Sequence, residues 1–186
     1  MKRACLIALS CSIGAANAEP AVTVETDYYS IIGTSAHELR RQMHLFGPKD
    51  SGGAYDAYTR WNVRWSYHYR QGNGQCAIAR VATSADVAFT LPNWKNSSEG
   101  PRELQQKWRD YLSALQQHEE GHKTFALRAA AEIEDAIAAM SAATSCADLA
   151  QKANAIGERI VNHYRQEERA YDARTRHGAT QGATFP

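Results

Sequence analysis

The pattern of hydrophobic and polar positions predicts three β-strands in the first half of the chain. Residues 21–32 are rich in β-branched and aromatic side chains. Residues 61–70 alternate strictly, with aromatic and aliphatic side chains facing one way and polar side chains the other. A Gly-Asn-Gly turn at 72–74 then leads into a second β run at 76–91, which Pro92 is expected to end. The last two strands are therefore predicted to pair as an antiparallel hairpin with one buried face.

Three other segments show the spacing of helices. Ser35 and Glu38 form a capping box at the start of a short helix between the first two strands. Apolar side chains then recur with a helical period over residues 101–140, and again after a break at 141–145. From Tyr171 onward no period is visible, so we expect an irregular C-terminal tail.

These elements predict an α+β fold: a small antiparallel or mixed sheet with one short helix, followed by two long antiparallel helices and the tail. We expect Gly100 to be the N-cap of the first long helix and Pro101 its first helical residue. The length suits a single domain over residues 19–186, with a β-rich part at 19–95 and a helical, metal-binding part at 101–186.

The first long helix contains the stretch HEEGH, in which His118 and His122 are four residues apart and Glu119 follows the first histidine. Positions four apart lie one turn above each other on the same helix face, so both imidazoles point toward one place. Zinc in hydrolytic enzymes binds two imidazoles in this arrangement, and the glutamate between them takes a proton from the metal-bound water. The stretch therefore predicts Zn²⁺ as cofactor, His118 and His122 as ligands and Glu119 as general base.

The same two histidines have a simpler interpretation. Leu115, His118, His122 and Phe125 share the helix stripe that is expected to face the core. Buried imidazoles must be hydrogen-bonded or metal-bound to offset the loss of water. The alternative to a zinc site is therefore a pair of core histidines with ordinary hydrogen-bond partners.

A catalytic zinc site needs a third protein ligand, and the chain returning along the first long helix supplies four candidates. They are His163, Glu167, Asp172 and His177. His163 lies off the centre of the apolar stripe of its helix, whereas Glu167 lies near that centre, where an unpaired carboxylate is costly. Asp172 and His177 fall in the predicted tail, where functional groups are often held. Pairing with an arginine is the simpler explanation for Glu167, and solvation is the simpler explanation for the two tail residues.

Motifs spread over nearly the whole chain after residue 18 resemble a bacterial family of unknown-function proteins that are described as predicted secreted zinc-dependent proteases. The residues that carry the likeness are Tyr29-x-Ile31-x-Gly33, Glu38-Leu39-Arg40, Tyr55-Asp56-Ala57-x-Thr59-x-Trp61, Leu91-Pro92-x-Trp94, His118-Glu119-x-Gly121-His122 and Tyr171-Asp172-x-x-Thr175-x-His177-Gly178-x-Thr180-Gln181-Gly182-Ala183. The resemblance implies a zincin-like metallopeptidase with His177 as the third zinc ligand. In zincins a sheet edge beside the active-site helix binds substrate, so the strand at 61–70 or its partner is expected to flank the site.

Residues 1–18 have the features of a secretory signal peptide: a basic start, a short apolar stretch and an Ala-x-Ala end. Cleavage after Ala18 removes two of the four cysteines and leaves Cys76 and Cys146, which are expected to form a disulfide in an oxidising compartment. Lipid anchoring at Cys11 is the weaker alternative. No later window is apolar enough to span a membrane, so we expect a secreted or periplasmic protein.

Composition narrows the partners. The chain has 186 residues, 44% of them hydrophobic, and a net charge of +1, so it lacks the basic surface that nucleic acid or an anionic membrane attracts. The sequence predicts a secreted zinc metallopeptidase that acts on a protein or peptide, with Glu119 activating water and Tyr171 as a candidate for stabilising the oxyanion. Two alternatives stay open: a non-catalytic zinc-binding protein of the cell envelope, and hydrolysis of another amide such as a cell-wall cross-link.

Overall fold

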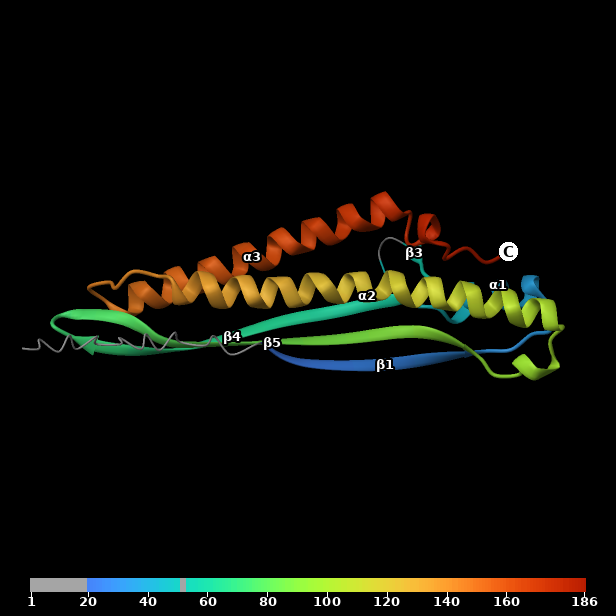
Figure 1. The fold of residues 1–186 in the computed structure, drawn as a ribbon, viewed down its shortest axis with the longest axis horizontal. Helices are drawn as coiled ribbons and strands as arrows, with labels where there is room; N and C mark the ends of the chain where they lie inside the picture. Colours follow the sequence, from blue (N-terminus) through green and yellow to red (C-terminus); the bar gives the residue numbers. More distant parts are fainter. Residues whose placement is uncertain (1–19, 51–52) are drawn as a thin grey trace, which may run out of the picture.

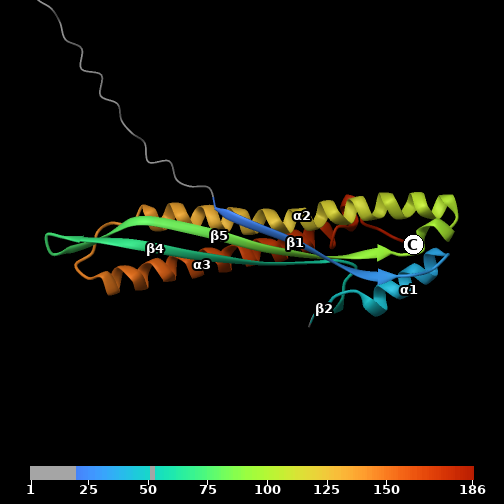
Figure 2. The same ribbon diagram turned by 90° about the horizontal axis from the view of Figure 1, so that it is seen from below.

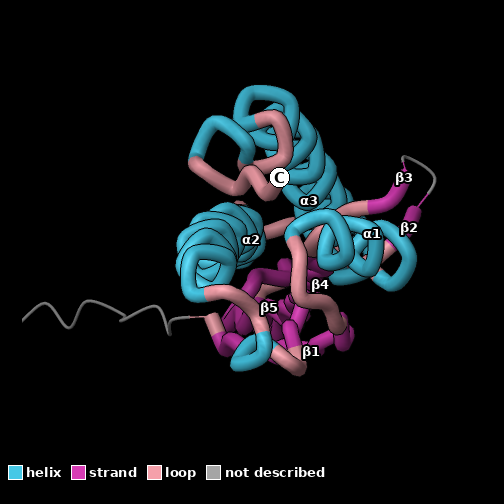
Figure 3. The backbone as a smooth tube through the Cα atoms, turned by 90° about the vertical axis from the view of Figure 1, so that its right-hand side faces the viewer, coloured by secondary structure: helices cyan, strands magenta, loops and turns pink. Residues whose placement is uncertain are grey.

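The structure is a computed structural model that describes residues 20–50 and 53–186. The predicted signal peptide, with Cys11, lies outside these residues. Figure 1 shows an elongated molecule built on a sheet and two long helices, α2 (Arg102–Ala138) and α3 (Cys146–Thr175). Seen end-on, both long helices lie on the same side of the sheet (Figure 3), and α3 contacts the sheet directly through the hydrogen bond of Trp61 to Glu168. The fold is α+β, as the hydrophobic pattern predicts.

The main sheet of the described residues has three strands in the order β1-β5-β4. β1 spans Ala21–Ile31, β4 spans Tyr58–Gly72 and β5 spans Gln75–Trp94. β4 and β5 pair antiparallel, which confirms the predicted hairpin, whereas β1 pairs parallel with β5. Figure 2 shows this mixed sheet in front of the helices. β2 (Lys49–Asp50) and β3 (Gly53–Ala54) form a separate two-stranded ladder.

The covered face of the sheet forms the core with α2. Trp61 and Val63 of β4 and Val87 and Phe89 of β5 are buried in one cluster with the apolar stripe of α2. These side chains occupy alternate positions on their strands, as the sequence pattern predicts. Burying each of them stabilises the fold by roughly 1.5–3 kcal/mol. The core therefore fixes which face of α2 turns inward.

Two element ends differ from the sequence prediction. β5 continues past Pro92 to Trp94, because β4 stops pairing at Thr90 and only β1 lies beside β5 from there on. The missing N–H of Pro92 therefore removes no bond between β5 and β4. Pro101, rather than Gly100, is the N-cap of α2, since its backbone is still extended with ψ of 145°.

The short helix α1 (Ala36–Phe46) begins at the predicted capping box. The Ser35 hydroxyl accepts a hydrogen bond from the Glu38 backbone N–H at 3.3 Å, and the Glu38 carboxylate accepts one from the Ser35 N–H at 3.2 Å. A one-turn 3-10 helix, η1 (Ser97–Glu99), connects β5 to α2. Local sequence signals therefore suffice to place α1.

The C-terminal part of the chain is more ordered than predicted. α3 continues to Thr175, so Asp172 lies on a helix and not in an irregular tail. The helix ends because Arg176 and His177 both take the left-handed conformation, with φ of 52° and 51°. A 3-10 turn, η2 (Ala179–Gln181), follows.

The two ends of the molecule are fastened in different ways. A disulfide joins Cys76 at the start of β5 to Cys146 at the start of α3, which confirms the predicted pairing. Near the C-terminus, the Phe185 ring packs against Tyr111 with ring centroids 5.0 Å apart. The Phe185 carbonyl oxygen accepts a hydrogen bond from the Arg40 guanidinium at 2.8 Å. The last residues are therefore tied to α1 and α2.

Candidate metal centre

The stretch HEEGH lies in the middle of α2, on the face turned to the inside of the molecule. His118, Glu119 and His122 are only 2%, 4% and 7% exposed. The apolar stripe of α2 includes these polar positions, so packing of the core carries them inward. Their burial requires that each has a partner.

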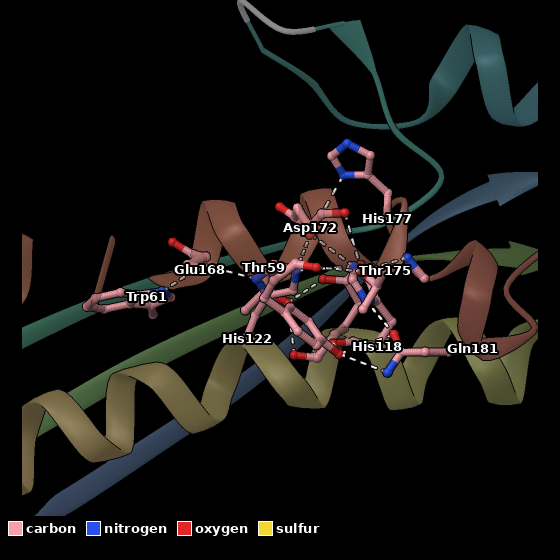
Figure 4. A network of polar contacts seen from close by, with 12 residues as sticks. Thr59, Trp61, His118, His122, Glu168, Asp172, Thr175, His177 and Gln181 are labelled. Atoms are coloured by element: carbon pink, nitrogen blue, oxygen red, sulfur yellow. Dashed lines mark hydrogen bonds and ion pairs between the residues drawn. The ribbon is translucent and has the colours of Figure 1, made fainter. Parts of the chain in front are cut away.

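Both imidazoles point toward Asp172 of α3, and three ligand atoms meet there (Figure 4). Asp172 Oδ1 lies 3.2 Å from His118 Nε2 and 3.1 Å from His122 Nε2. The two Nε2 atoms are 3.3 Å apart. Within the described part of the chain, this is the one group of His, Cys, Asp and Glu side chains whose donor atoms converge as a metal site requires.

The outer nitrogens of the two imidazoles are held by acceptors. His118 Nδ1 lies 2.9 Å from Gln181 Oε1, and His122 Nδ1 lies 3.1 Å from Glu168 Oε1. An amide or carboxylate oxygen only accepts, so each Nδ1 carries the proton and each Nε2 offers its lone pair. Histidine ligands of metal ions are oriented by partners of this kind.

Two lone pairs and a carboxylate oxygen repel each other at these distances unless positive charge lies among them. Asp172 Oδ1 is buried and makes no well-directed hydrogen bond, although two nitrogens lie close to it. Burial by itself lowers the pKa of His122, but the Asp172 and Glu168 carboxylates beside its two nitrogens raise it to about 9. Burial works to raise the pKa of Asp172, yet the two histidines hold it well below its usual value. The centre therefore attracts a proton or a cation.

The distances fit a tetrahedral metal ion. Zinc binds imidazole nitrogen and carboxylate oxygen at about 2.0–2.2 Å, so two ligand atoms on a tetrahedron lie about 3.3 Å apart. The three separations in the structure are 3.3, 3.2 and 3.1 Å. Two nitrogens and one oxygen are also the donors of many hydrolytic zinc sites, which keep a fourth position for water. The residues present therefore fit a zinc ion.

The carboxylate of Glu119 is held by the first strand of the hairpin. Thr59 of β4 donates a hydrogen bond to Glu119 Oε2 at 2.5 Å, and both side chains are buried. Burial raises the pKa of Glu119, although the Thr59 hydrogen bond and the nearby histidines act to lower it. A carboxylate with a raised pKa accepts a proton from water more readily near neutral pH. Glu119 is therefore suited to act as a base beside the centre.

Gly121 of α2 leaves room for the Tyr171 side chain of α3 at the centre. A Cβ at this position would overlap the ring and hydroxyl of Tyr171. That ring stacks on the His118 imidazole with centroids 4.9 Å apart, and its hydroxyl donates a hydrogen bond to the His118 carbonyl oxygen at 3.3 Å. Tyr171 thus supports His118 from behind. Its hydroxyl is turned to the backbone of α2, and Tyr171 does not line the pocket described below.

The other predicted ligands lie outside the converging group. His177, which the resemblance implied as third ligand, has its Nδ1 3.7 Å from Asp172 Oδ1, and its side chain is 59% exposed. The left-handed turn after α3 places it at the rim, while the helical Asp172 points at α2. His163 is exposed, and Glu167 lies about 100° around the helix from Glu168. Asp172, and not His177, is therefore the third member of the converging group.

Three residues around the centre were not predicted: Thr59, Glu168 and Gln181. Glu168 lies one helical turn before Asp172, so it would have been found if α3 had been predicted to continue through residue 172. It also accepts a hydrogen bond from Trp61 Nε1 at 2.7 Å, which fixes its carboxylate. Thr59 and Gln181 carry no pattern of their own and stand out only because they belong to the motifs quoted above.

A cavity of about 760 Å³ opens beside the centre. Its walls include the three converging side chains, Glu119 and the segment 54–59, which leads into β4. This volume lies within the range of small-ligand pockets. β4 is an edge strand of the sheet, so the start of an edge strand flanks the centre.

None of the described helices is long and apolar enough to cross a membrane. Among curated proteins and among solved structures, the comparisons find no match to this chain. A family model does match residues 26–178, a stretch that contains His118, Glu119, His122 and Asp172. Because this match covers most of the sequence, the chain belongs to the family described as bacterial protein of unknown function (DUF922).

Proposed function

We propose that this protein is a zinc-dependent hydrolase that cleaves peptide bonds, with His118, His122 and Asp172 as zinc ligands and Glu119 as general base. One observation carries the proposal: three ligand atoms converge within 3.1–3.3 Å of one another. The Nδ1 atoms of both histidines already have acceptors, which is the orientation that metal ligands need.

The protein's own residues are arranged for general-base catalysis. Zinc, when bound, supplies an acidified water and polarises the substrate carbonyl. Glu119 follows His118 directly on α2, so its carboxylate lies beside the ligands. Thr59 holds one oxygen of this carboxylate and leaves the other for the water. Glu119 then takes the proton of the attacking water and passes it to the leaving amine.

The pocket and the strand beside it support a peptide substrate. Tyr58 and Thr59 at the start of β4 line the cavity. Among the described strands, β4 pairs only with β5, so no strand covers its other edge. An extended peptide pairs readily with such a free strand edge. The disulfide between Cys76 and Cys146 supports a secreted or periplasmic location, where disulfides persist.

A non-catalytic zinc-binding protein is the second candidate, and the position of His177 favours it. His177 Nδ1 is 3.7 Å from Asp172 Oδ1 at the rim of the centre. A change of its side-chain rotamer toward the two imidazoles would add a fourth protein ligand. Zinc sites with four protein ligands are closed to water and stabilise structure instead of performing chemistry.

The metal content of purified variants distinguishes Asp172 from His177 as the third zinc ligand. We expect purified wild type to hold one zinc ion per chain, and Asp172→Ala and His122→Ala to hold almost none. His177→Ala should keep its zinc, because its nitrogen lies outside the converging group. Glu167→Ala, half a turn from the pocket face, is the matched control on the same helix. Loss of zinc in His177→Ala with retention in Asp172→Ala would refute the ligand set proposed here.

A peptide cleavage assay distinguishes the hydrolase from the non-catalytic zinc-binding protein. Glu119→Gln should keep its zinc and lose peptide hydrolysis by several orders of magnitude, because an amide cannot take the proton of the water. The assay is cleavage of a mixed peptide library followed by mass spectrometry. If zinc-loaded wild type and Glu119→Gln give the same peptide pattern, the non-catalytic candidate is correct.

A further inference from the structure

Four arginines line the pocket beside the centre, and they differ in whether other groups of the protein already bind them. Arg165 and Arg169 lie on the same face of α3 as Asp172, and Arg176 caps that helix. The spacing of four residues between Arg165 and Arg169 keeps these two on one side of the helix. Arg40 of α1 completes the set. Four arginines therefore line the cavity.

Two of these arginines, Arg40 and Arg165, already bind carboxylates of the protein. Arg40 donates two hydrogen bonds to the Asp56 carboxylate, at 2.8 and 2.6 Å, besides its bond to the Phe185 carbonyl. Arg165 donates to Glu168 at 3.2 Å, and its guanidinium lies 3.5 Å from the centroid of the Trp61 ring. Their positive charges are balanced by acids, and their side chains are held in place.

Arg169 and Arg176 bind no carboxylate among the described residues. Both are exposed, and neither makes a hydrogen bond or ion pair within residues 20–50 and 53–186. Asp172 is three residues from the first and four from the second, yet its carboxylate is turned to the histidines instead. Two exposed arginines without a partner among the described residues therefore line the cavity.

The net charge of the cavity also indicates that Arg169 and Arg176 can attract an anionic group. Among the described residues, four arginines and four carboxylates line it. A divalent ion held by Asp172 and its histidines would add two positive charges, which leaves Arg169 and Arg176 as the surplus. Guanidinium groups in a concave site attract carboxylates and fix them by paired hydrogen bonds.

We propose that Arg169 and Arg176 bind carboxylate groups of the substrate, so that this site selects acidic peptides. The inference rests on the proposed function, because it assigns a substrate class to the same cavity. Each exposed arginine–carboxylate pair contributes a factor of about 2 to 5 in binding. Two pairs together give a preference of about tenfold, which weakens as salt screens the charges.

Peptide binding tests this inference without hydrolysis. The protein is zinc-loaded Glu119→Gln, and the probe is a fluorescein-labelled, alanine-rich peptide with two glutamates. Versions with two glutamines or two lysines are compared by fluorescence anisotropy at low and high salt. We expect the glutamate peptide to bind about tenfold more tightly than the glutamine peptide at low salt, and the lysine peptide to bind most weakly.

The double variant Arg169→Gln with Arg176→Gln should bring the ratio between the glutamate and glutamine peptides close to one. Arg174→Gln is the matched control, since Arg174 is an exposed arginine on α3 that does not line the cavity. It should leave the preference unchanged. Equal binding of the three peptides, absence of binding, or a preference that survives the double variant each overturns the inference.

The outcomes also distinguish this inference from the proposed function. If wild type cleaves no peptide while Glu119→Gln shows the arginine-dependent preference, hydrolysis is wrong and the acidic ligand class stands. If wild type cleaves glutamate and glutamine peptides with equal kcat/KM, the hydrolase stands and the assignment of Arg169 and Arg176 is wrong.

Discussion

The two ends of the α2–α3 pair are held together by different chemistry. Near the start of α3 the contact is apolar, with Ile137, Leu149 and Ala153 fully or almost fully buried and a disulfide beside them. Toward the end of α3 the helix rises away from α2 (Figure 1), and polar side chains span the space. There Glu168 and Asp172 reach the two histidines.

This difference separates the scaffold from the proposed chemistry along one pair of helices. Apolar burial stabilises the first end without any ligand. At the second end, desolvated lone pairs and carboxylates oppose close approach until positive charge is present among them. The apolar end therefore sets where the polar groups stand, and the polar end contributes little stability of its own without a cation.

The largest expected effect comes from breaking the apolar end. Replacing both Cys76 and Cys146 by alanine removes a link between residues 70 apart in sequence. We expect the free energy of unfolding to fall by about 2–5 kcal/mol in denaturant titrations. The zinc content of the folded protein should stay that of wild type, because the disulfide lies at the other end of the helices. A loss of zinc in this variant would show that the two ends are not independent.

The next effect comes from weakening the polar end alone. Glu168→Gln keeps an acceptor for His122 and Trp61 but removes the negative charge that makes the imidazole a stronger ligand. We expect zinc affinity, measured by competition with a chelator, to fall by about 10- to 100-fold. The free energy of unfolding of the metal-free protein should change little. Glu167→Gln, its neighbour on α3, is the control and should match wild type in both measurements.

A matched pair of glycines compares the two ends directly. Gly121 faces the Tyr171 ring at the polar end, and Gly157 faces the Trp65 ring at the apolar end. Because an added methyl group would overlap an aromatic ring in both cases, each alanine variant should lose about 1–3 kcal/mol of stability. Zinc affinity should fall only in Gly121→Ala, where displacement of Tyr171 moves the adjacent Asp172. Equal losses of affinity in both variants would contradict the separation.

The smallest effect concerns the turn that ends α3. His177 has φ of 51°, a conformation that favours glycine. His177→Gly should therefore raise the free energy of unfolding by about 1 kcal/mol and leave zinc content unchanged. Arg176→Gly, with φ of 52°, is the matched control and should show the same gain. A loss of zinc confined to His177→Gly would identify His177 as a ligand.

Elements with a strong local pattern could be predicted from sequence. The alternation in β4 and the capping box of α1 are set by neighbouring residues. The capping box appears as predicted, and the alternation holds through Tyr67 but not at Tyr69, which follows a β-bulge and is exposed. The end of α3 could not be predicted in the same way. Residues 171–175 have no apolar period, and tertiary contacts such as the stacking of Tyr171 on His118 hold them as helix.

The same dependence on tertiary contacts limits how much of the candidate site could be predicted from sequence. Spacing alone puts His118 and His122 on one face, because that relation lies within a single helix. The identity of the third candidate ligand depends on how α3 is rotated against α2. A change of one residue turns a side chain by about 100°, which is the difference between Glu167 and Glu168. Only the packed structure fixes that rotation, and it directs Glu168 and Asp172 to the histidines.

The attachment of Phe185 to Tyr111 and Arg40 has a consequence for how the site is assembled during synthesis. The ribosome makes the two histidines before Glu168, Asp172 and Gln181, which follow their histidine partners by 46 to 63 residues. A growing chain therefore cannot complete the proposed zinc site before α3 and η2 have been made and docked. Loading of the proposed site follows that docking, and a substitution that loosens Phe185 would interfere with the step that seats Gln181 against His118.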